Sequence, residues 1–173
     1  GDVYKRQYIY LSIGTNKGDR ISNSKLVIKK ISNISNIIKI SNFYKTQSWG
    51  FSADYFLNFI IQIQTKLLPI DLLDELIKIE KQMGRYRKPH LNENKYISRI
   101  IDIDILFYGS EIINSKKLII PHPRINLRNF ILVPLSELCP NFICPVTNKK
   151  IKEILKDCQD KSMVEKTKAL IHI

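Results

Sequence analysis

The stretch that most limits how this chain can fold is the alternating segment at residues 99–106, which reads Arg-Ile-Ile-Asp-Ile-Asp-Ile-Leu. Successive side chains of a strand point to opposite faces, so its odd-numbered isoleucines share one face and Asp102 and Asp104 share the other. Two adjacent carboxylates repel each other and are costly in apolar surroundings unless a cation lies between them. The segment therefore predicts a strand with a core on one side and an acidic pair on the other.

This acidic pair is typical of a magnesium site that also binds phosphate. A few hard oxygen ligands that leave room for water and phosphate suit Mg²⁺ better than Zn²⁺. Taken alone, the pair also fits a strand with ordinary surface acids. Residues 85–128 hold five arginines, a residue that binds phosphate in a fixed fork: Arg85, Arg87, Arg99, Arg124 and Arg128. Together these residues predict chemistry of the phosphoryl-transfer type.

Apolar periodicity and turn signals elsewhere predict an α+β domain. We expect strands at 8–13, 38–46, 59–65 and 100–108 and a small hairpin within 112–120. We expect a first helix that begins near Asp19 or Ser22, and three further helices at 69–84, 128–138 and 149–157. The order strand–helix–strand–strand–helix–strand is the ferredoxin-like, split βαβ pattern. We therefore predict a sandwich in which helices cover the faces of a mostly antiparallel sheet.

Length and composition favour a single domain. The 173 residues are 44% hydrophobic and 25% charged, which suits one compact core. We expect a non-native or disordered leader at 1–7, a domain at 8–158 and a tail at 159–173. No apolar run approaches the ~18–20 residues of a membrane span, and the N-terminal stretch lacks the apolar core of a secretory signal. Three cysteines without CxxC spacing predict reduced thiols in a cytosolic protein.

The charge balance raises a second class of function. Lys and Arg number 28 against 16 Asp and Glu, a formal net charge of +12 that would suit binding to a phosphate backbone. Most of these cations are scattered lysines, which favours a solvated surface. A ferredoxin-like nucleic-acid-binding module without catalytic activity is the alternative function. It requires exposed aromatic residues on the central strands, and none is evident.

Two further groups of residues suggest ligand contacts. Glu80 falls on or beside the apolar stripe of its helix, where its carboxylate needs either a ligand group or a nearby arginine as partner. Trp49, Phe56 and Asn58 offer aromatic faces and an amide, which a flat heterocycle requires, although core aromatics and a turn residue explain them equally well.

Several motifs in order make the chain resemble the 6-hydroxymethyl-7,8-dihydropterin pyrophosphokinase family over about residues 8–158. Residues 99–106 match its signature R-x-x-D-[LIV]-D-[LIVM]-[LIVM]. Further matching motifs lie at 13–16, 43–46, 49–50, 56–58, 79–80, 84–87, 121–124, 128–130 and 134–135.

The resemblance implies an ATP- and Mg²⁺-dependent diphosphotransferase of folate biosynthesis. Such an enzyme moves the terminal diphosphate of ATP to the hydroxymethyl oxygen of the pterin and releases AMP. The resemblance further implies a cytoplasmic monomer with no nucleic-acid or membrane partner. A family member that binds without catalysing is a further alternative.

The resemblance also implies roles for particular residues. Asp102 and Asp104 would hold two Mg²⁺ ions and, with Arg85 and Arg99, form the catalytic group. The implied ATP-binding residues are Glu80, Arg87, Lys117, His122 and Arg128. The implied pterin-binding residues are Thr46, Gln47, Trp49, Phe56, Asn58, Tyr96 and Phe130. Tyr96 stands where many relatives have Trp.

Overall fold

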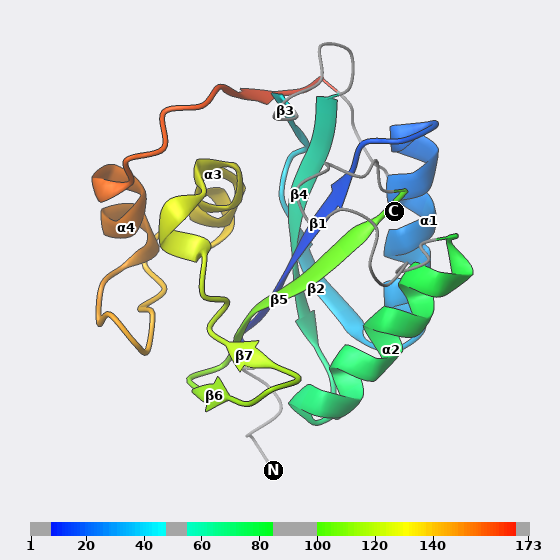
Figure 1. Ribbon diagram of the computed structural model, residues 1–173, viewed down its shortest axis with the longest axis horizontal. Coiled ribbons are helices and arrows are strands. Elements are labelled where there is room, and N and C mark those ends of the chain that lie inside the picture. Colours follow the sequence, from blue (N-terminus) through cyan, green and yellow to red (C-terminus); the bar gives the residue numbers. More distant parts are fainter. Residues whose placement is uncertain (1–7, 48–54, 85–99, 169–173) are drawn as a thin grey trace.

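The computed structural model describes residues 8–47, 55–84 and 100–168 (Figure 1). Its strands are β1 (Ile9–Thr15), β2 (Asn36–Ile40), β3 (Tyr44–Gln47), β4 (Tyr55–Gln64), β5 (Asp102–Tyr108), β6 (Ile113–Asn114), β7 (Ile119–Ile120) and β8 (Val164–Lys166). Its helices are α1 (Arg20–Ser32), α2 (Pro69–Gln82), α3 (Asn129–Leu138) and α4 (Ile151–Asp157), with a short 3₁₀ helix at Ile125–Leu127.

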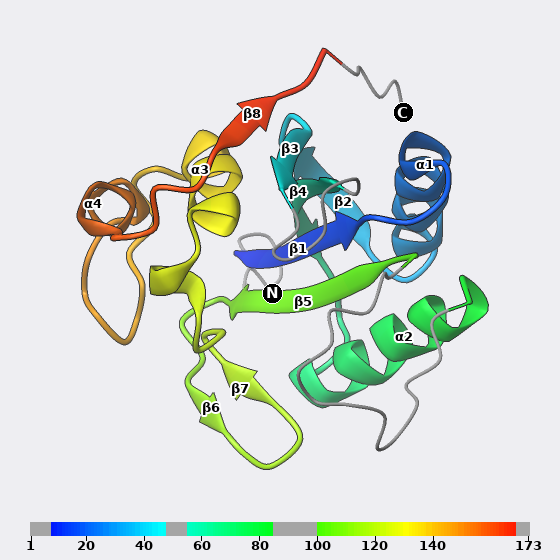
Figure 2. The same ribbon diagram turned by 45° about the horizontal axis from the view of Figure 1, so that its top comes forward.

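The main sheet is antiparallel throughout. Its strands follow the order β5-β1-β4-β3-β8, and β2 pairs with the second half of β4. Helices α1 and α2 cover one face, while α3 and α4 lie on the other (Figures 1 and 2). The short strands β6 and β7 form a separate hairpin. The predicted α+β domain with a ferredoxin-like order of strands is confirmed.

Alternation along the strands divides the interior into two cores. One core lies between the sheet and α1 and α2, and it contains every isoleucine of β1, β4 and β5 except Ile60, among them Ile103 and Ile105. The other lies beneath α3 and α4, where Tyr10, Ile60 and Phe107 meet apolar residues of both helices. The sheet is therefore the middle layer of three.

The helices lie where the sequence predicts, and each predicted end is found within two residues. The Asp19 side chain accepts a hydrogen bond from the Ser22 backbone N–H at 3.0 Å, so Asp19 and not Ser22 caps α1. Pro69 stands at the first position of α2, where a missing N–H costs nothing. Gly84 follows α2 with a φ of 91°, a left-handed conformation that favours glycine.

The strand expected at 38–46 is two strands. Ser41 accepts a hydrogen bond from the Ile60 N–H through its hydroxyl and donates its own N–H to the Ile60 carbonyl, both at 2.9 Å. A side-chain oxygen thus occupies a position in the ladder, and the chain shifts between β2 and β3. The strand expected at 59–65 begins earlier, at Tyr55, because β3 pairs with its first residues.

Among the described residues no helix has both the length and the apolar character needed to span a bilayer. All three cysteines, Cys139, Cys144 and Cys158, are free thiols buried in the core beneath α3 and α4. Burial raises the pKa of the Cys139 thiol to about 12, so this thiol is protonated at neutral pH.

We predict that the native thiols resist modification. At pH 8 each should react with a disulfide reagent at least about a hundredfold more slowly than in the denatured chain, because burial both blocks access and suppresses the thiolate. Met163→Cys provides the control, since Met163 is 66% exposed and its replacement should react at once. Rapid labelling of a native cysteine in the unsubstituted chain would contradict the placement of the second core.

Candidate functional site

One face of the sheet changes from apolar to polar along its length. On the side of α3, the residues near one end of the strands belong to the second core. Towards the other end the same face carries small or polar residues: Ser12, Gly14, Asn58, Asp102 and Asp104. They share a face because directly paired residues of neighbouring strands point the same way. This polar end of the sheet is the candidate site.

Residues of four strands lie in one row across the polar end. In register, Asp102 is opposite Gly14, Gly14 is opposite Asn58, and Asn58 is opposite Tyr44. Asp104 is opposite Ser12 in the next row. Two strand spacings, roughly 10 Å, therefore separate the acidic pair from the strand of Asn58. The strand between them contributes only a glycine to that row.

The register of β5 is held from α2 by a buried carboxylate. Glu80 is 3% exposed, and its Oε2 accepts a hydrogen bond from the Ile103 backbone N–H at 3.2 Å. Ile103 lies between the two aspartates on the outer strand of the sheet, whose outward N–H groups need partners other than a strand. Glu80 thus positions the acidic pair. Its contact with ATP stays a prediction.

The acidic pair fits Mg²⁺ better than a metal that needs a complete protein cage. Asp102 and Asp104 are half-buried and lie on the same face of β5. In the described part of the chain, no group of three or more His, Cys, Asp and Glu could hold a metal ion. Mg²⁺ commonly uses only one or two carboxylates and completes its shell with water and substrate phosphates.

His122 lies near Asp102 and near the guanidinium groups of Arg124 and Arg128. Partial burial lowers the pKa of His122, and the charges of Arg128 and Arg124 lower it further against the opposing effect of Asp102. His122 therefore favours its neutral form. Its Nδ1 accepts a hydrogen bond from the Arg124 N–H at 3.2 Å, which assigns the proton to Nε2. The Nε2–H group is then a hydrogen-bond donor for an anionic ligand.

Arg128 and Phe130 come together at the start of α3. Arg128 occupies the N-cap position, and its guanidinium carbon lies 5.5 Å from the centre of the Phe130 ring. Phe130 is half-buried at the margin of the second core. A cation and an aromatic face are thus available at this helix end.

Thr46 and Asn58 form a buried pair beside the row. Asn58 donates a hydrogen bond from Nδ2 to the Thr46 hydroxyl oxygen at 2.7 Å, and both side chains are buried. A Cβ added at Gly14 would lie 2.9 Å from Asn58 Oδ1 and 3.9 Å from a carbon of the Phe56 ring. The absence of a side chain at Gly14 thus leaves room for the orientation of Asn58.

The remaining predicted residues lie elsewhere. Lys117 forms an ion pair of 2.8 Å with Asp74, six residues before Glu80 on α2, and both side chains are largely exposed. Gln47 ends β3 and is paired with Tyr55. Five predicted residues lie outside the described part: Trp49, Arg85, Arg87, Tyr96 and Arg99.

Two residues of the site were not predicted. Ser12 shares the face of Asp104, and Gly14 occupies the row between Asp102 and Asn58. Alternation within the first strand places both opposite its isoleucines, which is the signal that identifies them. Their partners across the sheet depend on register, which the sequence does not give.

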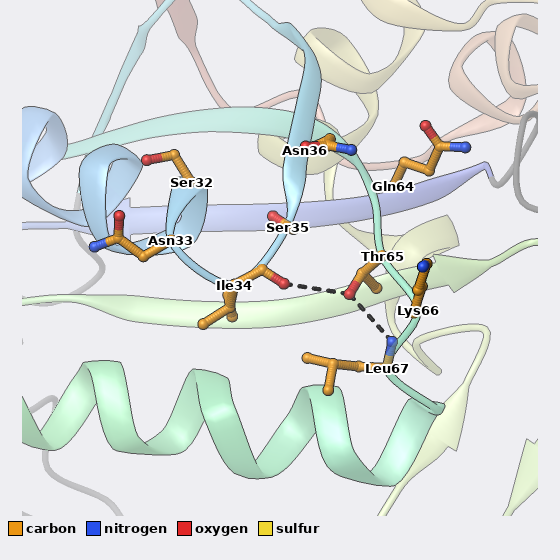
Figure 3. Close-up of a pocket in the computed structure, with 9 residues that line it drawn as sticks. All are labelled: Ser32, Asn33, Ile34, Ser35, Asn36, Gln64, Thr65, Lys66 and Leu67. Carbon is orange, nitrogen blue, oxygen red and sulfur yellow. Dashed lines mark hydrogen bonds between the residues drawn. The ribbon is translucent and has the colours of Figure 1, made fainter.

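The cavity shown in Figure 3 lies at the far end of the sheet. Its volume is about 470 Å³, and it is lined by residues 32–36 and 64–67. Six strand residues, roughly 20 Å, separate Gln64 from Asn58 along β4. The Thr65 hydroxyl there bonds to the Ile34 carbonyl and the Leu67 N–H, each at 3.2 Å. None of the predicted site residues lines this cavity.

Comparison with known proteins identifies relatives along most of the chain. A family model described as 7,8-dihydro-6-hydroxymethylpterin-pyrophosphokinase (HPPK) matches residues 10–140. A 2-amino-4-hydroxy-6-hydroxymethyldihydropteridine pyrophosphokinase of Aquifex aeolicus is 42% identical over 146 residues, which cover 84% of this chain and 88% of the relative. A Haemophilus influenzae protein of the same name is 36% identical over 160 residues, covering 90% and 96%.

Solved structures share the fold. The wild-type HPPK-DHPS of Plasmodium falciparum superposes with a TM-score of 0.68 at 16% identity, over 87% of this chain and 44% of that one. A structure of HPPK-DHPS in complex with substrates has a TM-score of 0.69 at 15% identity, over 87% and 43%. The chain thus spans less than half the length of these solved chains.

We predict that Gly14→Ala disturbs the pair of Asn58 and Thr46. The new methyl group would displace Asn58 Oδ1, so the free energy of unfolding should fall by about 1–2 kcal/mol, the worth of a buried hydrogen bond. Urea denaturation measures this loss. In a Thr46→Val background, where the bond is already absent, the same substitution should cost less than half as much. Equal costs in both backgrounds would contradict the coupling.

Proposed function

The chain belongs to the 7,8-dihydro-6-hydroxymethylpterin-pyrophosphokinase family, and we propose that its reaction takes place at the polar end of the sheet. It is a pyrophosphokinase of folate synthesis, which transfers diphosphate from ATP to the hydroxymethyl group of the dihydropterin. The observation that carries the placement is the acidic pair opposite Gly14 and Ser12, with Asp102 near His122, which in turn lies near Arg128.

The reaction exchanges one phosphorus–oxygen bond for another. The hydroxymethyl oxygen forms a bond to the β-phosphorus of ATP, and the bond from that phosphorus to the bridging oxygen of AMP breaks. The hydroxyl proton is released. In such a transfer the protein mainly positions the reactants and neutralises charge.

Asp102 and Asp104 would hold two Mg²⁺ ions. Bound Mg²⁺ supplies positive charge that offsets the charge of the phosphates and of the leaving AMP. The isoleucines between and beside the aspartates anchor β5 in the first core, and Glu80 holds Ile103 from α2. The two carboxylates therefore need little rearrangement when the ions and ATP bind.

The phosphates of ATP would lie against His122 and Arg128. A neutral imidazole with its proton on Nε2 donates to a phosphate oxygen, and a guanidinium donates two parallel hydrogen bonds. Arg85, Arg87, Arg99 and Lys117 are the other cations to which the resemblance to the family gives this role. The pair of Lys117 with Asp74 is exposed, so exchange of Asp74 for a phosphate would cost little.

The pterin would lie across the row from the acidic pair. Thr46 and Asn58 offer polar atoms for the edges of the ring, while Phe56 and Phe130 offer aromatic faces. Gln47, Trp49 and Tyr96 are the other residues that the resemblance to the family places at the pterin. Because Gly14 has no side chain, the space between Asp102 and Asn58 would be open to the hydroxymethyl group.

The nucleic-acid alternative finds no support. A module of that class exposes the aromatics of its central strands, whereas Tyr10 of β1 is 2% exposed beneath α3 and α4. We propose instead an enzyme that acts as a cytoplasmic monomer, in keeping with a substrate pair of small molecules and with three free thiols.

We predict that incubation with ATP, Mg²⁺ and 6-hydroxymethyl-7,8-dihydropterin yields AMP and the pterin diphosphate in equal amounts. Separation of the nucleotides by ion-exchange chromatography measures this directly. Formation of ADP, or no turnover by a folded chain, would contradict the proposed reaction.

We predict that Asp102→Asn and Asp104→Asn each lower kcat by at least about a hundredfold, because each removes a charge from the metal site. Asp71→Asn, an exposed change of the same chemistry in the first turn of α2, is the matched control and should leave kcat unchanged. With a non-hydrolysable ATP analogue, the unsubstituted chain should bind two Mn²⁺ ions, counted by electron paramagnetic resonance. Two active Asn variants would refute the metal assignment.

A further inference from the structure

Helix α3 lacks a cap from its own N-terminal residues. Its N-cap position is held by Arg128, whose side chain makes no capping hydrogen bond. Ser, Thr, Asp and Asn are preferred there, since their short side chains accept from the first free N–H groups of the helix. Arg128 has no acceptor to offer, and its guanidinium instead lies near the Phe130 ring.

The missing cap comes from a distant part of the chain. Asp160, which lies 31 residues beyond Asn129, accepts a hydrogen bond from the Asn129 backbone N–H at 3.1 Å through Oδ2. Its other oxygen, Oδ1, accepts from the Ser162 N–H at 2.9 Å and from the Ser162 hydroxyl at 2.5 Å. A carboxylate at this position also interacts favourably with the positive end of the α3 dipole.

A second contact ties the same two segments together. Asn129 is 8% exposed, and its Nδ2 donates to the Ser162 carbonyl oxygen at 2.6 Å. Its Oδ1 is the one buried side-chain polar atom without a hydrogen-bond partner in the described part of the chain. Burial of an unpaired acceptor is unfavourable, so the contribution of Asn129 lies in the two bonds it makes to residues 160 and 162.

The chain beyond Ser162 continues onto the sheet. Strand β8 pairs with β3, with Val164 opposite Thr46 and Lys166 opposite Tyr44. The Thr167 N–H then donates to the Phe43 carbonyl at 2.8 Å. In Figure 2 this segment passes from α4 across the start of α3 to the edge of the sheet. One segment thus holds both Thr46 and the helix turn that carries Phe130.

We propose that residues 160–167 are a positioning segment for the pterin pocket, in which Asp160 replaces the cap that Arg128 cannot supply. The segment sets the separation between Phe130 and Thr46, the two sides of the pocket. This proposal rests on the proposed function. Asp160 is a positioning residue, since it acts on the ligand only through Asn129 and the turn that follows.

The first test measures ligand affinity in Asp160→Ala. In the presence of a saturating non-hydrolysable ATP analogue, the Kd of the pterin should rise about tenfold, because a lost cap loosens the turn that carries Phe130. The Kd of the ATP analogue should rise less than about threefold, since most of its predicted contacts lie elsewhere. Equal changes in both constants, or no change in either, would overturn the proposal.

Two variants control this measurement. Asp157→Ala removes an exposed carboxylate three residues earlier, whose only ion pair in the described part is a 3.8 Å contact with Lys149, and both constants should stay unchanged. Asp160→Asn retains one acceptor oxygen of the two and should raise the pterin Kd only two- to threefold, an order-of-magnitude expectation for half of the lost bonds. If Asp160→Ala fails to fold, the Asn variant carries the test, and an unchanged pterin Kd there would refute the proposal.

Amide hydrogen exchange tests the capping of α3 by Asp160 separately from its effect on pterin binding. The Asn129 amide should exchange about tenfold faster in Asp160→Ala than in the unsubstituted chain, and at the unchanged rate in Asp157→Ala. Unchanged exchange in both variants would show that Asp160 does not cap α3. If the unsubstituted chain bound no pterin, the proposed function would fail, while the cap itself would still be decided by the exchange rates.

Discussion

The burial of three isoleucines beside two aspartates is the constraint from which the rest of the site follows. Because Ile101, Ile103 and Ile105 lie in the core beneath α1 and α2, the period of the strand directs both carboxylates to the opposite face. There they would be costly under an apolar helix. Helix α3 accordingly covers only the end of that face where β1 and β4 contribute Tyr10 and Ile60.

The elements on both sides of β5 then hold the acidic pair in place. The outer edge of β5 is bound by Glu80, and its inner edge pairs with β1 from Ile9 to Gly14. A buried carboxylate that accepts a backbone N–H costs less than one without a partner, and it joins α2 to the strand that carries the chemistry. The first core and the polar site are thus parts of one assembly.

The sequence predicted the elements of this fold more completely than their pairing. Periodicity located the helices, and alternation in residues 99–106 placed both aspartates on one face, because each signal is local. The division of 38–46 into two strands depends on the Ser41 hydroxyl entering the ladder of β4, a contact between residues far apart in sequence. Alignment of Asp102, Gly14 and Asn58 in one row likewise depends on register between strands. The motifs identified candidate site residues, but only the strand pairing shows that Gly14 lies between Asp102 and Asn58.

A contact between distant residues also explains how the N-terminus of α3 can contribute a cation to the binding site. A short polar residue at the N-cap would stabilise α3 locally, but it would replace the guanidinium that lies near His122. Capping by Asp160 relieves this conflict, since a carboxylate from 31 residues away satisfies the Asn129 N–H and leaves position 128 to a cation. Partial burial alone would raise the pKa of Asp160, yet the hydrogen bonds from Ser162 and Asn129 hold it below its usual range, so the cap stays charged at neutral pH. An anion at this helix end also lowers the cost of keeping Arg128 beside Phe130, because it balances part of the positive charge gathered there.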